Sequence, residues 1–224
     1  MSSITDNVVR IKSELPEGVK LLAATKTQSA AAVREAIAAG VDACGENHVQ
    51  ELVAKGREDA YRGAPLHFIG HLQTNKLRQV VGVCDLIESV DSEALLRLID
   101  RRAGELRLTQ DVLFEINIGR EPAKSGFDPE ALPALLDTLG EYPCVRVRGL
   151  MAIPPISEVP GGNLTYFMAM RQLFVDFMRK KGDNGEESIL SMGMSGDYLD
   201  AARAGATLVR VGTGIFGPRA QAGI

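Results

Sequence analysis

The sequence lacks several features that would mark other classes of protein. Its three cysteines, Cys44, Cys84 and Cys144, are odd in number and show no metal-ligand spacing. This argues against a disulfide framework and against a structural zinc site. No pair of the three histidines has ligand spacing either, so we assign no metal. The cysteines are therefore interpreted as buried, reduced thiols of an intracellular protein.

Long apolar runs and blocks of one charge are also missing. No segment approaches the roughly 20 apolar residues of a membrane-spanning helix, and residues 1–18 contain no apolar core of a secretion signal. The 25 basic and 29 acidic residues give a formal net charge of −4. Without a basic run or a basic patch interleaved with aromatic residues, nucleic acid is not expected as a partner. We predict a cytoplasmic protein that binds neither membrane nor nucleic acid.

Short apolar runs alternate with amphipathic helical patterns from one end of the chain to the other. The predicted strands are 20–25, 41–45, 66–70, 86–89, 111–117, 145–152, 188–192 and 207–211. The predicted helices are 29–39, 47–55, 75–80, 92–105, 129–139, 164–179 and 198–204. Gly40 and Gly205 stand where left-handed residues end helices. Asp91, Asp128 and Asp197 stand where side chains cap helix starts.

Eight strands alternating with helices indicate parallel βαβ units joined by right-handed crossovers. Two α/β architectures fit this order, a closed (β/α)8 barrel of the TIM type and an open, doubly wound sheet. The strand count of eight favours the barrel, as does the lack of a Gly-rich nucleotide turn opening the chain. No internal repeat and no mark of a second domain are present. We therefore predict a single barrel domain over residues 1–224.

The most informative pattern lies in residues 188–217, which read as strand, Gly/Ser turn, helix, strand and second Gly-rich turn. Ser195 offers a hydroxyl, and Gly212 and Gly214 let backbone N–H groups approach an anion closely. The loops after strands seven and eight of a barrel are where phosphate sites recur. We predict a phosphate cup here, with ordinary turn chemistry as the alternative.

Two basic side chains suggest the chemistry of the ligand in this cup. Lys26 ends the N-terminal apolar strand, where partial desolvation would free its amine for Schiff-base formation. The alternative is a solvated lysine between strand and loop. Arg210 lies mid-strand between valines and needs a partner, either a ligand heteroatom or a carboxylate. A lysine amine beside a phosphate cup indicates a phosphorylated aldehyde.

Other polar residues follow strands at the same predicted rim. Glu46 and Asn47 end the second strand, and Asn47 could either face the site or cap the next helix. His71, after the third strand, could face a ligand or have a structural role, whereas His67 better fits a packing or surface position. Residues 154–162, PPISEVPGG, are predicted to form an extended loop at this rim.

Taken together, these residues resemble the pyridoxal phosphate (PLP) homeostasis protein family. The matching segments are ATKT (24–27), GENHVQEL (45–52), HFIGHLQTNK (67–76), ESVDS (88–92), INIGREPAKSGF (116–127), GLMAIPP (149–155), LSMGMSGDY (190–198) and VRVGTGIFGPR (209–219). They span almost the whole chain in order, which makes the resemblance specific. The sequence departs from the family pattern at His48, where a tyrosine is common, and at Gln28, where a proline is often found.

The resemblance implies one barrel of the alanine racemase N-terminal type that holds PLP as an internal aldimine. Carried onto this sequence, the cofactor-binding residues are Lys26 as the Schiff-base lysine, Ser195 with the backbone N–H groups of Gly212 and Thr213 at the phosphate, Arg210 at the pyridine nitrogen, and Asn47 and His71 at the mouth. No catalytic residue is implied.

Three functions are compatible with these residues. The first is a PLP-binding protein of intracellular PLP (vitamin B6) homeostasis that lacks conventional catalysis and has PLP-dependent apoenzymes as partners. The second is an amino-acid racemase or decarboxylase; such relatives add a β-domain and a dimer partner, which we do not expect after Ile224. The third is a Schiff-base aldolase acting on a phosphosugar, which would not require Arg210 at a ring nitrogen. We predict the first, in a monomer.

Overall fold

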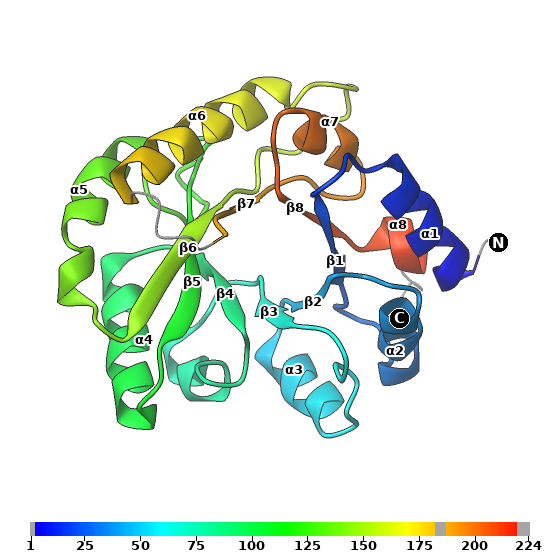
Figure 1. Cartoon of the computed structure of the whole chain (residues 1–224), viewed down its shortest axis with the longest axis horizontal. Helices are drawn as coiled ribbons and strands as arrows, with labels where there is room; N and C mark the ends of the chain where they lie inside the picture. The colour runs from blue at the N-terminus through cyan, green and yellow to red at the C-terminus, as the bar shows by residue number, and fades with distance from the viewer. Residues whose placement is uncertain (1–2, 182–186, 219–224) are drawn as a thin grey trace.

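Eight parallel strands form a closed barrel in the computed structural model, which describes residues 3–181 and 187–218 (Figure 1). The strands are β1 (Lys20–Ala24), β2 (Ala43–Glu46), β3 (Leu66–Phe68), β4 (Leu86–Val90), β5 (Gln110–Glu115), β6 (Val145–Met151), β7 (Ile189–Ser191) and β8 (Leu208–Val211). They pair in chain order, and β1 pairs with β8, where Leu22 lies opposite Arg210. This pairing excludes the open sheet and confirms the predicted barrel.

The helices lie outside the ring of strands (Figure 1). The α-helices are α1 (Ile4–Glu14), α2 (Ala30–Ala38), α3 (Val49–Gly56), α4 (Glu93–Leu106), α5 (Leu132–Asp137), α6 (Leu164–Lys181), α7 (Tyr198–Arg203) and α8 (Thr213–Phe216), and the 3-10 helices are η1 (Thr74–Gln79), η2 (Pro129–Ala131) and η3 (Leu139–Glu141). Over the described ranges, no helix has both the length and the apolar character needed to cross a membrane.

Helices form in all the predicted segments, but two of these segments are not single α-helices. The helix predicted at 75–80 is the 3-10 helix η1, a form common in short connectors. The helix predicted at 129–139 is divided into η2, α5 and η3. Pro133 lacks the N–H that a continuous helix would need there, but it is tolerated in the first turn of α5. Gly40 and Gly205 follow α2 and α7 at φ angles of 99° and 102°, as predicted.

The predicted aspartate caps are only partly correct. Asp91 does not cap α4, because the helix begins one residue later than this prediction requires. Ser92 is the N-cap, and its hydroxyl accepts a hydrogen bond from the Leu95 N–H at 3.3 Å. Asp128 and Asp197 do precede η2 and α7, but neither side chain makes a capping hydrogen bond.

The barrel interior is polar toward its centre. Residues on a strand alternate between the two faces, so Val209 and Val211 pack outward against the helices while Arg210 faces inward. Glu88 and Ser191 are also buried there. Apolar side chains fill the rest of the interior in two small clusters, made of Leu22, Ala43, Ile69 and Leu208 and of Leu86, Leu113 and Met151.

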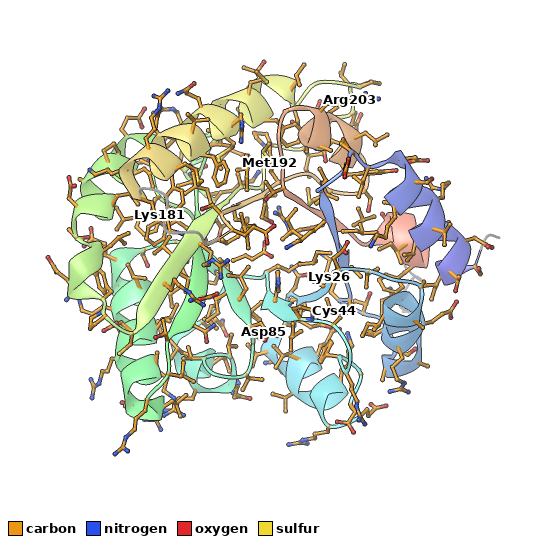
Figure 2. All side chains as sticks on the ribbon, viewed as in Figure 1. Lys26, Cys44, Asp85, Lys181, Met192 and Arg203 are labelled. Carbon is orange, nitrogen blue, oxygen red and sulfur yellow. The ribbon has the colours of Figure 1, made fainter. Side chains whose placement is uncertain are left out.

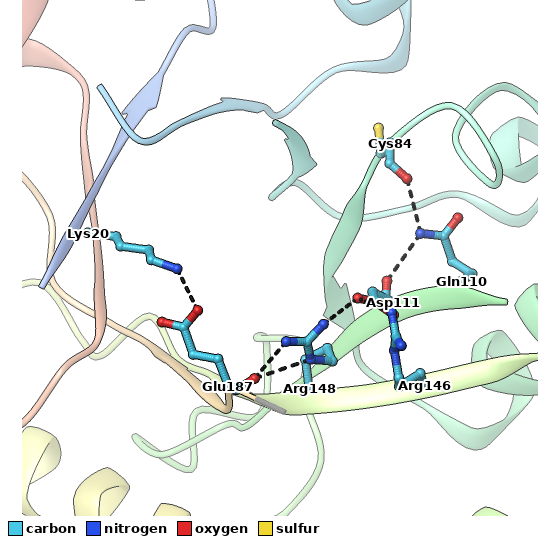
Figure 3. A network of polar contacts seen from close by, with 7 residues as sticks. All are labelled: Lys20, Cys84, Gln110, Asp111, Arg146, Arg148 and Glu187. Carbon is cyan, nitrogen blue, oxygen red and sulfur yellow. Dashed lines mark hydrogen bonds and ion pairs between the residues drawn. The ribbon is translucent and has the colours of Figure 1, made fainter. Parts of the chain in front are cut away.

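Ion pairs gather at the N-terminal ends of the strands (Figure 3). The Lys20 ammonium donates to the Glu187 carboxylate at 2.6 Å. The Arg148 guanidinium donates to Asp111 at 2.8 Å and to the backbone oxygen of Glu187 at 2.8 Å. Gln110 bridges the backbone oxygens of Cys84 and Asp111. Polar groups therefore tie β1, β5 and β6 together at this end of the barrel.

We expect the three thiols to differ strongly in reactivity. Cys44 and Cys84 are buried and Cys144 is partly exposed. Burial raises the pKa of Cys44 to about 12, so near pH 8 its thiolate fraction is on the order of 10⁻⁴. Iodoacetamide should therefore alkylate Cys144 first in the folded protein, and all three thiols in denaturant, as read by peptide mass. Equal labelling of Cys44 in the folded protein would contradict its burial.

Candidate functional site

Lys26 lies two residues beyond the end of β1 and is partly buried (Figure 2). The next residue, Thr27, has φ 66°, in the left-handed region that costs a non-glycine residue about 1–2 kcal/mol. Its N–H donates to the Glu51 carboxylate at 2.6 Å, and its hydroxyl donates to the Lys26 backbone oxygen at 2.6 Å. The chain around Lys26 is thus fixed in an unusual conformation by specific contacts.

A buried ion cluster supports this segment from outside the barrel. The Lys55 ammonium donates to the Thr25 backbone oxygen at 2.7 Å, to Glu46 at 2.6 Å and to Glu51 at 2.9 Å. Glu46 also accepts hydrogen bonds from the Thr25 and Tyr61 hydroxyls, at 2.5 and 3.0 Å. The prediction that Glu46 reaches the mouth is wrong, because the alternation along β2 turns it toward α3.

Ser195 and the glycine turn after β8 come together as predicted. The Ser195 hydroxyl oxygen accepts hydrogen bonds from the N–H groups of Gly212 and Gly214, both at 3.2 Å. A Cβ on Gly214 would lie 2.8 Å from a Val211 methyl carbon, so this turn has little room for a larger residue. Thr213 begins α8 and is exposed. Backbone donors from one turn therefore converge on an oxygen carried by the neighbouring turn.

Arg210 lies inside the barrel and is 4% exposed. Its Nη1 donates to the Ser191 hydroxyl at 2.6 Å, and its Nη2 donates to the Ala152 backbone oxygen at 2.9 Å. A Glu88 carboxylate oxygen lies 3.9 Å from Nη1. Burial lowers the pKa of Arg210, and the negative charge of Glu88 opposes that shift. The sequence left two kinds of partner open for Arg210, a ligand atom or a carboxylate. The structure shows the carboxylate of Glu88, which is linked to Arg210 mainly through the Ser191 hydroxyl.

Asn47 and His71 line one cavity of about 370 Å³ at the rim. The Asn47 Oδ1 is buried and has no hydrogen-bond partner among the described residues. Capping is not its role, because His48 is the N-cap of α3. The His71 side chain is 62% exposed, and its Nδ1 lies 3.3 Å from an Asp91 oxygen and 3.4 Å from the Ser125 hydroxyl. Both residues therefore border the mouth, and Asn47 has a free hydrogen-bonding capacity.

A carboxylate that sequence reasoning missed lies beneath the mouth. Glu88 is fully buried, with one oxygen 2.7 Å from His67 Nδ1 and the other accepting from the Ser191 hydroxyl at 2.6 Å. Burial by itself raises the pKa of Glu88, but His67, Arg210 and Ser191 outweigh burial and hold it below its usual value. The sequence signal was a glutamate inside the apolar run LIESV, beside an arginine that needs a counter-charge.

The loop 154–162 follows β6 and lies beside the Ser195 turn, as predicted. Ile156 and Val159 are 92% and 70% exposed. Residues 155–163 line a cavity of about 340 Å³ together with Met194 and Asp197. A largely exposed loop therefore borders the Ser195 turn at the mouth.

Comparison with known proteins assigns the family. The family described as "Alanine racemase, N-terminal domain" matches residues 1–220. Proteins named pyridoxal phosphate homeostasis protein are 42% identical in Aquifex aeolicus, over 89% of this chain and 87% of the relative, and 40% identical in Escherichia coli, over 98% of each. The chain belongs to the pyridoxal phosphate homeostasis protein family.

Solved structures agree with this membership. Another member of the group, PipY of Synechococcus elongatus, has a structure with PLP bound that superposes on this chain with a TM-score of 0.86. The two proteins are 38% identical over 96% of this chain and 100% of PipY. Alanine racemase of Clostridium difficile shares the fold, with a TM-score of 0.79 at 15% identity. The superposition covers 98% of this chain in the homeostasis family but 57% of the racemase chain. The similarity therefore concerns one domain of the racemase.

Proposed function

We propose that this protein binds PLP through a Schiff base on Lys26 and acts in PLP homeostasis as one domain over residues 1–224. The observation that carries the proposal is the convergence of three groups on one end of the barrel. These are Lys26, the donors around Ser195 and the buried Arg210. The PLP-bound structure of PipY, a relative of similar length, supports the cofactor assignment. Recipient apoenzymes, a monomeric state and a cytoplasmic location stay predictions.

The turn geometry suits the phosphate of PLP. Phosphate oxygens are strong acceptors, and backbone N–H groups in a concave turn are the donors that such anions take. Gly212 and Gly214 already direct their N–H groups at one oxygen, that of Ser195. We assign the phosphate to the Ser195 hydroxyl and to the N–H groups of Gly212 and Thr213, with Gly214 as a further donor.

Arg210 suits the pyridine nitrogen because it is fixed and can only donate. A guanidinium has no acceptor, so the nitrogen that faces it must accept the hydrogen bond and stay unprotonated. Bound PLP supplies an aldehyde for Schiff-base exchange and an electron sink that weakens when its ring nitrogen is unprotonated. Ser191 and Ala152 hold the guanidinium from the protein side. Asn47 and His71 would border the ring at the mouth.

We propose a carrier function in place of conventional catalysis. Racemisation needs acid/base groups on both faces of the substrate. The tyrosine nearest the phosphate turn, Tyr198, instead donates its hydroxyl to Glu14 on α1, and Tyr61 donates to Glu46 behind the barrel wall. Both phenols are therefore engaged away from the mouth. An assay for amino-acid racemisation and decarboxylation by the PLP-loaded protein tests this part, and rapid turnover would contradict it.

Absorbance spectroscopy tests the cofactor proposal directly. The purified protein should show a visible Schiff-base band, either as isolated or after incubation with PLP. Borohydride should bleach the band and leave a reduced PLP adduct on the peptide that contains Lys26, as located by mass. If excess PLP produces no band, the proposal fails and a phosphosugar aldolase becomes the better interpretation.

Replacing Ser195 with alanine should weaken PLP binding about tenfold or more, because the hydrogen bond between its hydroxyl and the charged phosphate is lost. Equilibrium dialysis with PLP measures the change. Pyridoxal, which has no phosphate, should bind the variant and the wild type alike. Ser188→Ala, which removes a buried hydroxyl before β7, is the matched control. An equal loss for both ligands would argue against a phosphate role.

A further inference from the structure

A continuous chain of buried polar groups crosses the barrel from the candidate site to its opposite end. Arg210 donates to Ser191 at 2.6 Å, Ser191 donates to Glu88 at 2.6 Å, and the other Glu88 oxygen lies 2.7 Å from His67 Nδ1. The four residues are at most 8% exposed. Glu88 is thus paired with His67 through one oxygen and linked to Arg210 through Ser191 by the other.

His67 connects this chain to the far end of the barrel. It lines a cavity of about 100 Å³ together with Lys20, Asp42 and Glu187, which all stand at the N-terminal ends of strands. Figure 3 shows the ion pair of Lys20 and Glu187 at this end. A cavity above about 15 Å³ has room for a water molecule, and Lys20, Asp42 and Glu187 offer it polar partners here. His67 can therefore exchange protons with solvent without an opening of the barrel at the cofactor end.

We propose that the charge of His67 tunes the bound pyridine nitrogen through Glu88, Ser191 and Arg210. The inference rests on the proposed function, since it needs PLP with its ring nitrogen at Arg210. Because Glu88 is ionised and accepts, a neutral His67 carries its proton on Nδ1. A second proton, on Nε2, makes the imidazole a cation that shares the charge of Glu88. Arg210 is then less compensated and becomes a stronger donor to the ring nitrogen.

Other charges act on the two ends of the chain without joining them. Glu115 on β5 and Asp197 before α7 act on Arg210 through space. Lys20, Asp42 and Glu187 share the cavity of His67. Each of these groups acts on one end of the chain, and burial raises the pKa of Glu115. Glu88 differs because it contacts both His67 and Ser191 directly, so it carries the coupling.

The coupling must be reciprocal. If a protonated His67 favours an acceptor at Arg210, then loading PLP there favours protonation of His67. We expect the titration midpoint of His67 to rise on loading, by about half a pH unit, which corresponds to a threefold change in affinity. PLP should correspondingly bind about threefold more tightly below that midpoint than above it. His67 is a positioning residue in this scheme, because it does not touch the cofactor.

An NMR titration of the histidine imidazoles tests the inference. The chain has three histidines, so few resonances have to be assigned. The apo and PLP-loaded full-length proteins are titrated, with His48→Gln and His71→Gln used for assignment. A raised midpoint of His67 on loading supports the coupling. Loading that is visible by absorbance but leaves the midpoint unchanged overturns it and leaves the proposed function intact. If PLP does not bind at all, the proposed function fails and the inference falls with it.

Two further variants separate coupling from general disturbance. Ser191→Ala should cut the PLP-induced shift of the His67 midpoint by half or more. Ser89→Ala removes a buried hydroxyl next to Glu88 in sequence that has no hydrogen-bond partner among the described residues, and it should leave the shift unchanged. His67→Gln keeps a donor for Glu88 but cannot gain charge. Its PLP-loaded form should lose the absorbance change between about pH 5.5 and 8 that His48→Gln retains. If the absorbance of PLP-loaded His67→Gln still changes with pH as in the wild type, the proposal is overturned. This result does not depend on whether Ser191→Ala folds stably.

Discussion

Replacing Lys26 with alanine should abolish covalent attachment of PLP while leaving the barrel folded. In the proposed function, Lys26 supplies the amine that forms the Schiff base, whereas Ser195 and Arg210 supply only hydrogen bonds, which dialysis breaks. The side chain is partly exposed and lies outside the buried core, so its removal should change stability by less than about 1 kcal/mol. The variant is incubated with PLP, dialysed and reduced with borohydride, and its intact mass is measured by mass spectrometry. Circular dichroism reports the fold.

Lys76→Ala is the matched control for this experiment. Lys76 lines the rim cavity with Asn47 and His71, so it is a lysine that PLP would meet on the way in. Its removal should leave the Schiff-base band and the adduct on Lys26 intact. Lys26→Ala should still bind PLP reversibly through the phosphate turn, and dialysis should remove it. A variant that stays yellow after dialysis would show that the Schiff-base lysine is misassigned.

The barrel and the contact between Ser195 and the glycine turn after β8 were predictable from local rules. Apolar runs alternating with helical patterns specify parallel strands, and eight of them can close. The carboxyl ends of parallel strands meet at one end of a barrel, so residues that follow β1, β7 and β8 have to approach one another. The contact of Ser195 with Gly212 and Gly214 follows from that geometry, because their turns leave neighbouring strands. Neither the helices nor the side-chain contacts were needed for this prediction.

The buried charged residues were harder to predict because a barrel strand is covered on both faces. In β2 all four residues, ACGE, are buried, so the apolar pattern cannot say which side chains face the interior. The sequence pattern therefore predicts Glu46 at the mouth, whereas its side chain pairs with Lys55 of α3. Asn47, the next residue, does line the rim. Glu88 and Ser191 lie 103 residues apart in the sequence, and only the closed sheet brings them to Arg210.

The ion cluster behind Lys26 should have the largest effect on stability. Lys55 and Glu46 have side chains that are 8% and 0% exposed and lie 2.6 Å apart. Removing one member of such a buried pair leaves an uncompensated charge, and Lys55→Met should lower the free energy of unfolding by about 3–5 kcal/mol. Urea unfolding measures the loss. Lys20→Met, in an ion pair whose side chains are 49% and 55% exposed, should cost less than about 1 kcal/mol.

A double variant separates the charge effect from the loss of a hydrogen bond to the main chain. Glu46→Gln in the Lys55→Met background removes the stranded carboxylate and should recover part of the stability. It cannot restore the hydrogen bond from Lys55 to the Thr25 backbone oxygen. Glu51 would also lose a cation while it still holds the left-handed Thr27. PLP affinity should therefore stay reduced in the double variant even where stability recovers, because the segment that presents Lys26 is no longer fixed. Full recovery of both quantities would show that Lys55 acts only through charge.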